Sequence, residues 1–427
     1  MQSTLFYIPA TLLGIPVFGF GWLLAAWALF SAVLLAWLWS RPGGRQEAAG
    51  YLPFVAIVAA VIVLVLPNMI FRDPAGRALG VPIRGFGVML MLATVSSVGL
   101  AAYRAWQVGV DPEAIYSLAF VMFIAGIAGA RLFFVVQYWR EFVVFAGGGG
   151  LDLPATVRRM LNFTEGGLVV YGSVLAGLPA GAWFCWKRRL PLLVIADIIA
   201  PSMVLGQALG RIGCFLNGCC FGSVCLTASY AVTFPIDSPP YKQQTQAGWQ
   251  SGVWLDAKQG GIIVDYVAPG SPAQKAGVKA GERIDAINGT VVDDLAAARS
   301  ALAKGNGAYF VRTTDKREFL WQTPPLPARS VPVHATQIYS AIDAGLLALV
   351  LWLAYPFRRR DGEIFALLVT FHPVSRFLLE AIRSDEPGRF GTALTISQWL
   401  SIAILVLVIE LWVYVELQPR RSEAAVT

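Results

Sequence analysis

Residues 190–210 read Leu-Pro-Leu-Leu-Val-Ile-Ala-Asp-Ile-Ile-Ala-Pro-Ser-Met-Val-Leu-Gly-Gln-Ala-Leu-Gly, and Asp197 is the one charged side chain among them. An α-helix needs about 20 mostly apolar residues to cross the hydrocarbon core of a bilayer. This segment has that length and composition, so it predicts a membrane-spanning helix. The fold of the chain therefore depends on how many such runs surround it.

The composition of the whole chain agrees with a membrane protein. The 427 residues are 56% hydrophobic and 14% charged, which lies outside the range of soluble globular domains and excludes a soluble enzyme. The net charge of +7 comes from basic residues in short clusters between apolar runs, so we expect no nucleic-acid partner. Five cysteines are too few for a disulfide-stapled secreted scaffold.

Nine apolar runs are candidates for membrane spans. They lie near 14–39, 51–70, 81–103, 114–139, 166–187, 190–210, 337–357, 362–382 and 396–416. The first run is too long for a signal peptide and has no basic residue before it, so we interpret it as a retained span. We expect a multi-pass α-helical membrane protein with about nine transmembrane helices.

Basic clusters predict the orientation, because short cytoplasmic loops are enriched in Lys and Arg. Clusters at 187–189, 358–360 and 420–421 follow the fifth, seventh and ninth runs. One topology places all three inside, with the N-terminus outside and the C-terminus inside. Arg72 and Arg77 in the loop near 71–80 oppose this arrangement, but three separate clusters outweigh them.

Residues 243–325 form a stretch of different character, with a much higher density of charged residues. Short β-rich runs alternate with Gly and Asn turns, and Asp293-Asp294 precede a helical run from Leu295 to Leu302. The Ser271-Pro-Ala273 turn and Ile287-Asn-Gly289 resemble a PDZ domain of the bacterial protease-associated type. The resemblance implies a small α+β extracytoplasmic domain that binds a protein or peptide ligand by strand addition to its edge.

Ionisable residues at membrane depth usually face a cavity or pair with one another. On the eighth run, His372, Arg376, Glu380 and Arg383 are spaced by four, four and three, so they share one helix face. In the expected topology, seven polar residues from five segments lie at one depth in the outer half of the membrane: Arg131, Tyr171, Arg211, His334, Arg376, Glu380 and Arg383. Structural Arg–Glu pairs or snorkelling arginines are the alternative interpretation. Because the planar guanidinium suits phosphate, we expect a phospholipid headgroup.

The segment Gly210-Arg-Ile-Gly-Cys-Phe-Leu-Asn-Gly-Cys-Cys-Phe-Gly222 closes the sixth run with four glycines around Arg211. Glycines allow irregular backbone to approach a ligand closely. This segment resembles the signature of the prolipoprotein diacylglyceryl transferase family. In the same order, further segments resemble other elements of that family: Gly166–Gly172, His334–Tyr339, Arg376–Asp385 and Ser397–Ser401.

The resemblance covers 81–241 and 331–419, which we expect to form the two parts of the transferase core. Residues 1–80 would then be extra N-terminal transmembrane helices, and 243–325 the periplasmic insert. The family implies a bacterial cytoplasmic (inner) membrane protein with phosphatidylglycerol and the signal peptide of a prolipoprotein, bearing a lipobox cysteine, as its substrates.

The implied reaction transfers diacylglycerol to the lipobox thiol, forms a thioether and releases glycerol phosphate without a metal or another cofactor. Arg211 and Arg376 would stabilise the leaving phosphate. His334 is the best base by chemistry, with Tyr171 and Glu380 as alternatives. The residues expected to bind substrate are Arg131, Gly210, Gly213, Asn217, Gly222, Gln337, Tyr339, Glu380 and Arg383.

Four positions depart from the family pattern. Tyr171 stands where the family has histidine, Cys214 where it has asparagine, Cys219 where it has an acidic residue, and Phe86 where it has tyrosine. The second function class is therefore a catalytically altered paralogue that acts as a membrane receptor or chaperone through its PDZ-like domain.

Two further chemistries are disfavoured. An intramembrane metalloprotease needs His-Glu-x-x-His, which neither histidine of this chain belongs to. Cys214, Cys219, Cys220 and Cys225 lack the Cys-x-x-Cys spacing of zinc sites, so packing in a tight turn is favoured. A disulfide from Cys225 to Cys219 or Cys220 stays open as an alternative on an oxidising side.

Overall fold

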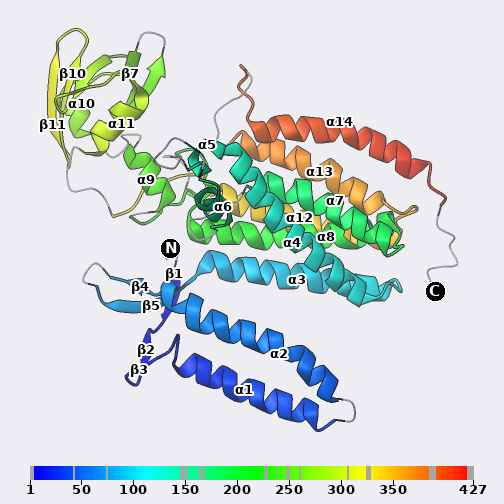
Figure 1. Ribbon diagram of the computed structural model, residues 1–427. Helices are drawn as coiled ribbons and strands as arrows, with labels where there is room; N and C mark the ends of the chain where they lie inside the picture. The colour runs from blue at the N-terminus through cyan, green and yellow to red at the C-terminus, as the bar shows by residue number, and fades with distance from the viewer. Residues whose placement is uncertain are drawn as a thin grey trace. The chain divides into compact units, whose positions relative to one another are not determined.

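A computed structural model describes residues 4–41, 44–73, 76–144, 150, 152–162, 167, 169–225, 229–236, 238–246, 251–258, 261–304, 307–323, 328–383 and 391–420. The chain divides into two compact units (Figure 1). The first unit comprises Met1–Met89, Gly213–Cys219 and Val224–Val333, and the second comprises Leu90–Ile212, Cys220–Ser223 and His334–Thr427. Each unit is described by itself.

The N-terminal part of the first unit combines a small sheet with two long helices. The sheet has the order β1-β5-β4 (Thr4–Ile8, Ala78–Arg84 and Phe71–Arg72), and β2 (Thr11–Leu12) pairs with β3 (Ile15–Pro16). Helix α1 spans Trp22–Trp39, and α2 spans Gly44–Ala60 and continues through η1 (Val61–Val65) and η2 (Leu66–Met69).

Two predicted helix starts are wrong in this part. The run expected from 14 begins its helix at Trp22, because Leu13 and Gly14 adopt positive φ in the β2–β3 turn. The run expected from 81 begins its helix at Gly85, because residues up to Arg84 pair with β1. Apolar content alone did not separate these strands from the helices that follow them.

The second unit is a bundle of long helices. Their bounds are α3 Gly85–Gln107, α4 Pro112–Gln137, α7 Val170–Lys187, α8 Leu192–Asn217, α12 Thr336–Ala354, α13 Glu363–Glu380 and α14 Ile396–Glu416. The first residues of α3 and the last of α8 belong to the first unit. Two short helices, α5 (Trp139–Phe142) and α6 (Leu153–Leu161), lie between α4 and α7 in the chain, and η4 (Tyr355–Phe357) extends α12.

Small residues let two helices of the second unit approach closely. Gly129 of α4 and Gly172 of α7 meet backbone to backbone, and a Cβ at either position would overlap the carbonyl oxygen of the other. Such small-residue crossings are the usual way that helices pack in a membrane. The contact places the start of α7, and therefore Tyr171, beside α4.

Seven of the described helices are long and apolar enough to cross a membrane. They are α1, α2 with its extension to Met69, α3, α4, α8, α12 with η4, and α14. These helices agree with a multi-pass helical membrane protein. The runs predicted at 166–187 and 362–382 form the helices α7 and α13, which are not among the seven.

A buried polar contact joins α13 to the start of α8, the end of that helix far from Arg211. The Asp197 carboxylate is fully buried and accepts hydrogen bonds from the backbone N–H groups of Gly362 (2.8 Å) and Phe365 (3.0 Å). Arg358 lies 3.7 Å from the same carboxylate. Asp197 therefore satisfies N–H groups at the first turn of α13 that have no partner within the helix.

The insert in the first unit is an α+β module with its own apolar core. Its sheet has the order β11-β10-β8-β7-β6, with β9 paired to β8. The bounds are β6 Val253–Lys258, β7 Gly261–Val267, β8 Arg283–Ile287, β9 Thr290–Val291, β10 Ala308–Thr313 and β11 Glu318–Gln322. Helices α10 (Pro272–Lys275) and α11 (Leu295–Ala303) pack on this sheet, and α9 (Pro239–Gln246) precedes it.

The helix predicted from Leu295 to Leu302 is confirmed as α11. The Asp294 carboxylate accepts the backbone N–H of Ala297 at 2.6 Å, so Asp294 is the N-cap. Ala298 and Leu302 are buried in the core of the insert together with Ile287 of β8. The strong local pattern of cap, small residues and leucine was therefore sufficient to predict this element.

Candidate functional site

Two arginines of the second unit share one buried carboxylate at the end of α13. Glu380 is 2% exposed, and its Oε2 lies 2.6 Å from Nη1 of Arg376 and 3.6 Å from Nη1 of Arg383. The Thr395 hydroxyl donates to the other oxygen of Glu380 at 3.3 Å. Two cations around one anion leave this cluster with a net positive charge, as the spacing along α13 predicts.

The first turn of α14 links this cluster to α7. Thr395 is the N-cap of α14 and forms a capping box with Gln398. The Ser397 hydroxyl in that turn accepts from Nη2 of Arg376 at 3.0 Å and lies 3.3 Å from the Tyr171 hydroxyl. Tyr171 and Arg376, far apart in the sequence, therefore contact the same side chain.

Residues 220–223 form backbone contacts with both the end of α13 and the start of α12. The Gly222 N–H donates to the His334 carbonyl at 2.9 Å, and the Ser223 N–H donates to the Ile382 carbonyl at 3.1 Å. Gly222 also forms a β-bridge with Arg383. A Cβ at Gly222 would lie 2.7 Å from both the His334 Cβ and the Thr336 Cγ2, so this position requires glycine.

His334 and Gln337 lie at the start of α12. Nδ1 of His334 is 3.4 Å from the Tyr339 hydroxyl, and the Gln337 side chain is fully buried. Because His334 also exchanges backbone hydrogen bonds with residues 222 and 223, its position is well determined. The structure thus brings His334 and Tyr339 together and links them through Gly222 to Arg383.

Arg211 differs from the other arginines of the site. It is half-buried on α8, and within the described part of the chain its guanidinium makes no hydrogen bond or ion pair. Both Arg211 and Arg376 lie within electrostatic range of His372 on α13. A partly buried guanidinium without a protein partner is chemically suited to hold an anionic ligand.

Arg131 makes contacts of another kind. Its side chain is buried and donates to four backbone carbonyls at 2.6–3.1 Å: those of Arg159, Met160, Asn162 and Gly167. These carbonyls belong to the end of α6 and the segment leading into α7. Arg131 therefore holds this connection in place, and its predicted contact with substrate stays a prediction.

Comparison with known proteins identifies the family. A family model described as prolipoprotein diacylglyceryl transferase matches residues 74–414. The chain is 34% identical to the phosphatidylglycerol–prolipoprotein diacylglyceryl transferase of Rhodopirellula baltica, over 95% of this chain and 87% of that relative. It is 23% identical to the Clostridium tetani protein of the same name, over 77% of this chain and 91% of that relative. The chain belongs to the prolipoprotein diacylglyceryl transferase family.

The glycine-rich family segment is more regular than expected. Instead of irregular backbone from Gly210 onward, α8 continues through Asn217. Gly213 is needed for packing, because a Cβ there would lie 3.2 Å from the Met89 Cβ and 3.3 Å from the Phe86 ring. No such neighbour surrounds Gly210. The segment therefore presents Arg211 from a rigid helix.

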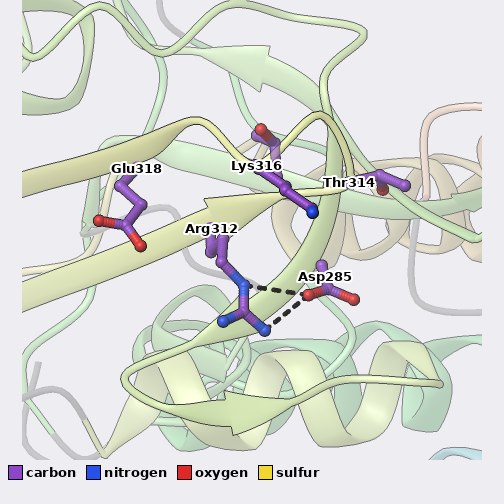
Figure 2. A pocket seen from close by; sticks show the side chains of 6 residues that line it. Asp285, Arg312, Thr314, Lys316 and Glu318 are labelled. Atoms are coloured by element: carbon purple, nitrogen blue, oxygen red, sulfur yellow. Dashed lines mark hydrogen bonds and ion pairs between the residues drawn. The ribbon is translucent and has the colours of Figure 1, made fainter.

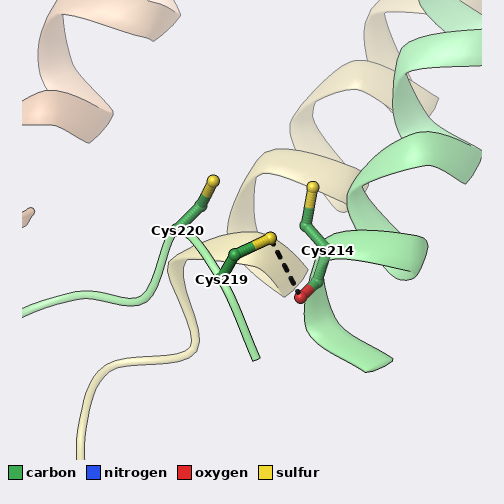
Figure 3. Close-up of side chains that lie close together, drawn as sticks. All are labelled: Cys214, Cys219 and Cys220. Carbon is green, nitrogen blue, oxygen red and sulfur yellow. Dashed lines mark hydrogen bonds between the residues drawn. The ribbon is translucent and has the colours of Figure 1, made fainter. Parts of the chain in front are cut away.

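Two of the positions that depart from the family pattern lie together at the end of α8. Gly218 has φ +78° and donates to the Phe215 carbonyl, while the Cys219 N–H donates to the Cys214 carbonyl at 3.1 Å. This pair of hydrogen bonds is a Schellman motif, in which the side chains of Cys214 and Cys219 come together. Their sulfur atoms lie within 4.8 Å of each other, and the Cys219 thiol points to the Cys214 carbonyl (Figure 3).

All five cysteines are free thiols in the structure. The disulfide considered from Cys225 to Cys219 or Cys220 is therefore not formed, and Cys225 is buried. Cys214, which the sequence did not suggest as a neighbour, is the close partner of Cys219. The sequence signal for this pairing was present, since glycine four residues after Cys214 is the usual C-terminal stop of a helix.

A pocket of 560 Å³ lies on the insert, and it shares no lining residue with the cluster on α13. Figure 2 shows the Arg312 guanidinium directed at Asp285, which it contacts through two hydrogen bonds of 2.7 and 3.1 Å. Lys316 and Glu318 also line this pocket. Because its charges are balanced and exposed, the pocket offers no chemistry for the family reaction.

Gly166 and Asp385, which belong to the segments that resemble the family, lie outside the residues that the structure describes. Sequence analysis placed His372 on the polar stripe but gave it no function. In the structure, three charged residues lie within electrostatic range of its ring: Asp343, Arg376 and Arg211.

Proposed function

We propose that the protein transfers diacylglycerol from phosphatidylglycerol to the lipobox cysteine thiol of secreted prolipoproteins. A sulfur–carbon bond forms at the glycerol carbon, the carbon–oxygen bond to phosphate breaks, and glycerol phosphate leaves with the bonding electrons. The thiol proton must pass to a base. Family membership and the names of the relatives support this reaction.

The observation that carries the proposal is the Arg211 guanidinium, which makes no hydrogen bond or ion pair within the described part of the chain and lies, like Arg376, within electrostatic range of His372. Charge accumulates on the phosphate oxygen as the carbon–oxygen bond breaks, and cations already in place stabilise it strongly. Arg376 is held by Glu380 and Ser397, so its direction is set before substrate binds. Arg211 is left to contact the phosphate directly.

The test is transfer of diacylglycerol to a synthetic lipobox peptide, followed by its gain in mass. Arg211→Ala is expected to lower the rate by at least 100-fold, and Arg211→Lys to recover part of it, because lysine keeps the charge but not the planar fork. The control is Arg158→Ala on the exposed face of α6, which should keep the wild-type rate. Peptide binding without any mass gain by the wild type would instead support the receptor or chaperone function.

The remaining predicted residues would shape the substrate site. Arg383 adds positive charge through Glu380, and Gly222 and Tyr339 border His334. Gln337 is buried in the first turn of α12, and Gly213 and Asn217 lie in the last turns of α8. Arg131 acts at a distance, because it holds the α6–α7 connection next to Tyr171.

We infer nine membrane spans, with α7 and α13 added to the seven strongly apolar helices. Ionisable residues of the site lower the hydropathy of α13, and α7 carries Tyr171; functional helices of this kind are expected in the interior of a bundle. The basic clusters favour an outside N-terminus, a periplasmic insert and a cytoplasmic C-terminus in the bacterial inner membrane. Labelling of single cysteines placed in the loops at 187–189 and 358–360 tests this orientation.

The insert is proposed to be a PDZ-like peptide-binding module. Strand β6 forms one edge of its sheet, and α11 packs beside it, so an extended peptide could add to β6 in the groove between them. Its proposed ligand is a segment of a prolipoprotein or of another envelope protein. Deleting 245–325 should lower the rate at limiting peptide concentration but not at saturation if the insert recruits substrate.

A further inference from the structure

His372 is a polar group within the site to which the family pattern assigned no role. It lies on α13 one helical turn before Arg376, on the same helix face. Its Nδ1 atom is buried and has no hydrogen-bond partner among the described residues. Because buried polar atoms in folded proteins almost always have a partner, an imidazole left in this state is suited to meet a substrate or water.

Three charged groups on three helices lie within electrostatic range of this imidazole: Asp343 on α12, Arg376 on α13 and Arg211 on α8. The two arginines are those expected to hold the phosphate. The lipobox thiol attacks the glycerol carbon next to that phosphate. It must therefore lie close to these arginines and within reach of the His372 ring.

The position at which the family has histidine is Tyr171 in this chain. Its hydroxyl contacts Ser397, and Ser397 accepts from Arg376. Tyr171 on α7 therefore reaches Arg376 through one side chain, and His372 lies one helical turn before Arg376 on α13. A neutral phenol is a weak base near pH 7, whereas imidazole accepts a proton readily.

Glu380 is less suited to the task, because two guanidiniums and a threonine hydroxyl already contact its carboxylate. His334 faces the Tyr339 hydroxyl at the start of α12. Of the two histidines in the chain, His372 is the one that lies among the phosphate-binding arginines.

We propose that His372 is the general base of this transferase and replaces on α13 the histidine that is missing from α7. Its ring nitrogen accepts the proton of the lipobox thiol as the sulfur–carbon bond forms, and the carbon–oxygen bonding pair leaves with glycerol phosphate. Asp343 stabilises the imidazolium that results. This inference rests on the proposed function, since it assigns a role in that reaction.

The first test compares His372→Gln and His372→Ala with His334→Ala in the peptide lipidation assay. A general base contributes about 100- to 10,000-fold to the rate, so both His372 variants should lose at least 100-fold in kcat. Their KM for phosphatidylglycerol should stay within about threefold. His334→Ala should lose at least tenfold less than either His372 variant.

The second test moves the histidine back. Introducing Tyr171→His into the His372→Ala protein should recover at least tenfold of the lost rate, which a merely structural His372 would not allow. The rate profile against pH should lose its acidic limb in His372→Gln and regain it in the double variant. Asp343→Asn should shift that limb without removing it.

Several outcomes would overturn the inference. A His372→Gln rate within tenfold of wild type, with wild-type transfer intact, excludes His372 as the base and leaves the proposed function standing. Loss of the folded state in both His372 variants assigns the histidine to packing instead. Absence of transfer by the wild-type protein would instead remove the proposed function itself.

Discussion

The Arg376 guanidinium and the Glu380 carboxylate form an ion pair of 2.6 Å, one helical turn apart on α13, with the carboxylate almost fully buried. Glutamate therefore sets the direction of the arginine, and Ser397 fixes a second donor of the same guanidinium. A cation held in this way needs little reorganisation when a phosphate arrives.

Removing one partner of this pair should cost more than removing both. Glu380→Ala leaves two arginines next to each other without their shared carboxylate, and a broken buried pair typically costs about 3–5 kcal/mol. Replacing both residues, Arg376→Met with Glu380→Met, should lose less stability while abolishing transfer. Thermal unfolding in detergent, measured beside the lipidation rate, checks this. Equal stability of the single and double variants would show that the pair carries no coupling.

Asp197 should affect stability and leave the chemistry unchanged. Asp197→Ala removes the acceptor for two N–H groups at the first turn of α13 and leaves Arg358 without its carboxylate. A lost cap costs about 0.5–2 kcal/mol, and the unpaired cation adds to this. The unfolding midpoint should fall, with kcat per folded molecule retained. Asp315→Ala, at an exposed pair of the insert, is the control and should leave the midpoint unchanged.

Gly222 should tolerate no side chain. Gly222→Ala places a methyl group 2.7 Å from His334 and Thr336. Residues 220–223 must therefore shift, at a cost of about 1–3 kcal/mol. Gly345→Ala is the matched control, because nothing lies within 4 Å of its added Cβ and alanine favours a helix. We expect a loss of transfer in the first variant and a slight rise in the unfolding midpoint in the second. Full activity of Gly222→Ala would contradict the packing described around His334.

Cys219 should crosslink to Cys214 in preference to Cys225. Their sulfur atoms are brought within 4.8 Å by the Schellman motif, whereas Cys225 is buried elsewhere in the chain. Mild oxidation of the purified protein should give a peptide mass lower by two hydrogens that contains 214 and 219, and Gly218→Ala should weaken this by straining the positive φ. Detection of a Cys219–Cys225 bond instead would show that the helix end rearranges.

Much of the membrane core was predictable, because a bilayer imposes length and composition on each crossing segment. The helix face of Arg376, Glu380 and Arg383 followed from their spacing, since residues four apart share one side of a helix. The N-terminal hairpin at 11–16 was missed, because its residues are as apolar as the helix that follows and only positive φ at two positions reveals the turn. The regular helix through 210–217 was also missed, because glycine lowers helix propensity while packing against Phe86 and Met89 outweighs it.

Read by itself, the sequence determined a multi-pass helical membrane protein and a helix from Leu295 to Leu302. It also predicts that several arginines lie at one depth. Only the tertiary structure decided how those arginines differ: Arg131 holds backbone carbonyls, Arg376 and Arg383 share Glu380, and Arg211 is left without a protein partner in the described part of the chain. The reason is that periodicity fixes which way a side chain points from its own helix. What that side chain meets depends on residues from other helices, whose approach is set by packing that no local pattern records.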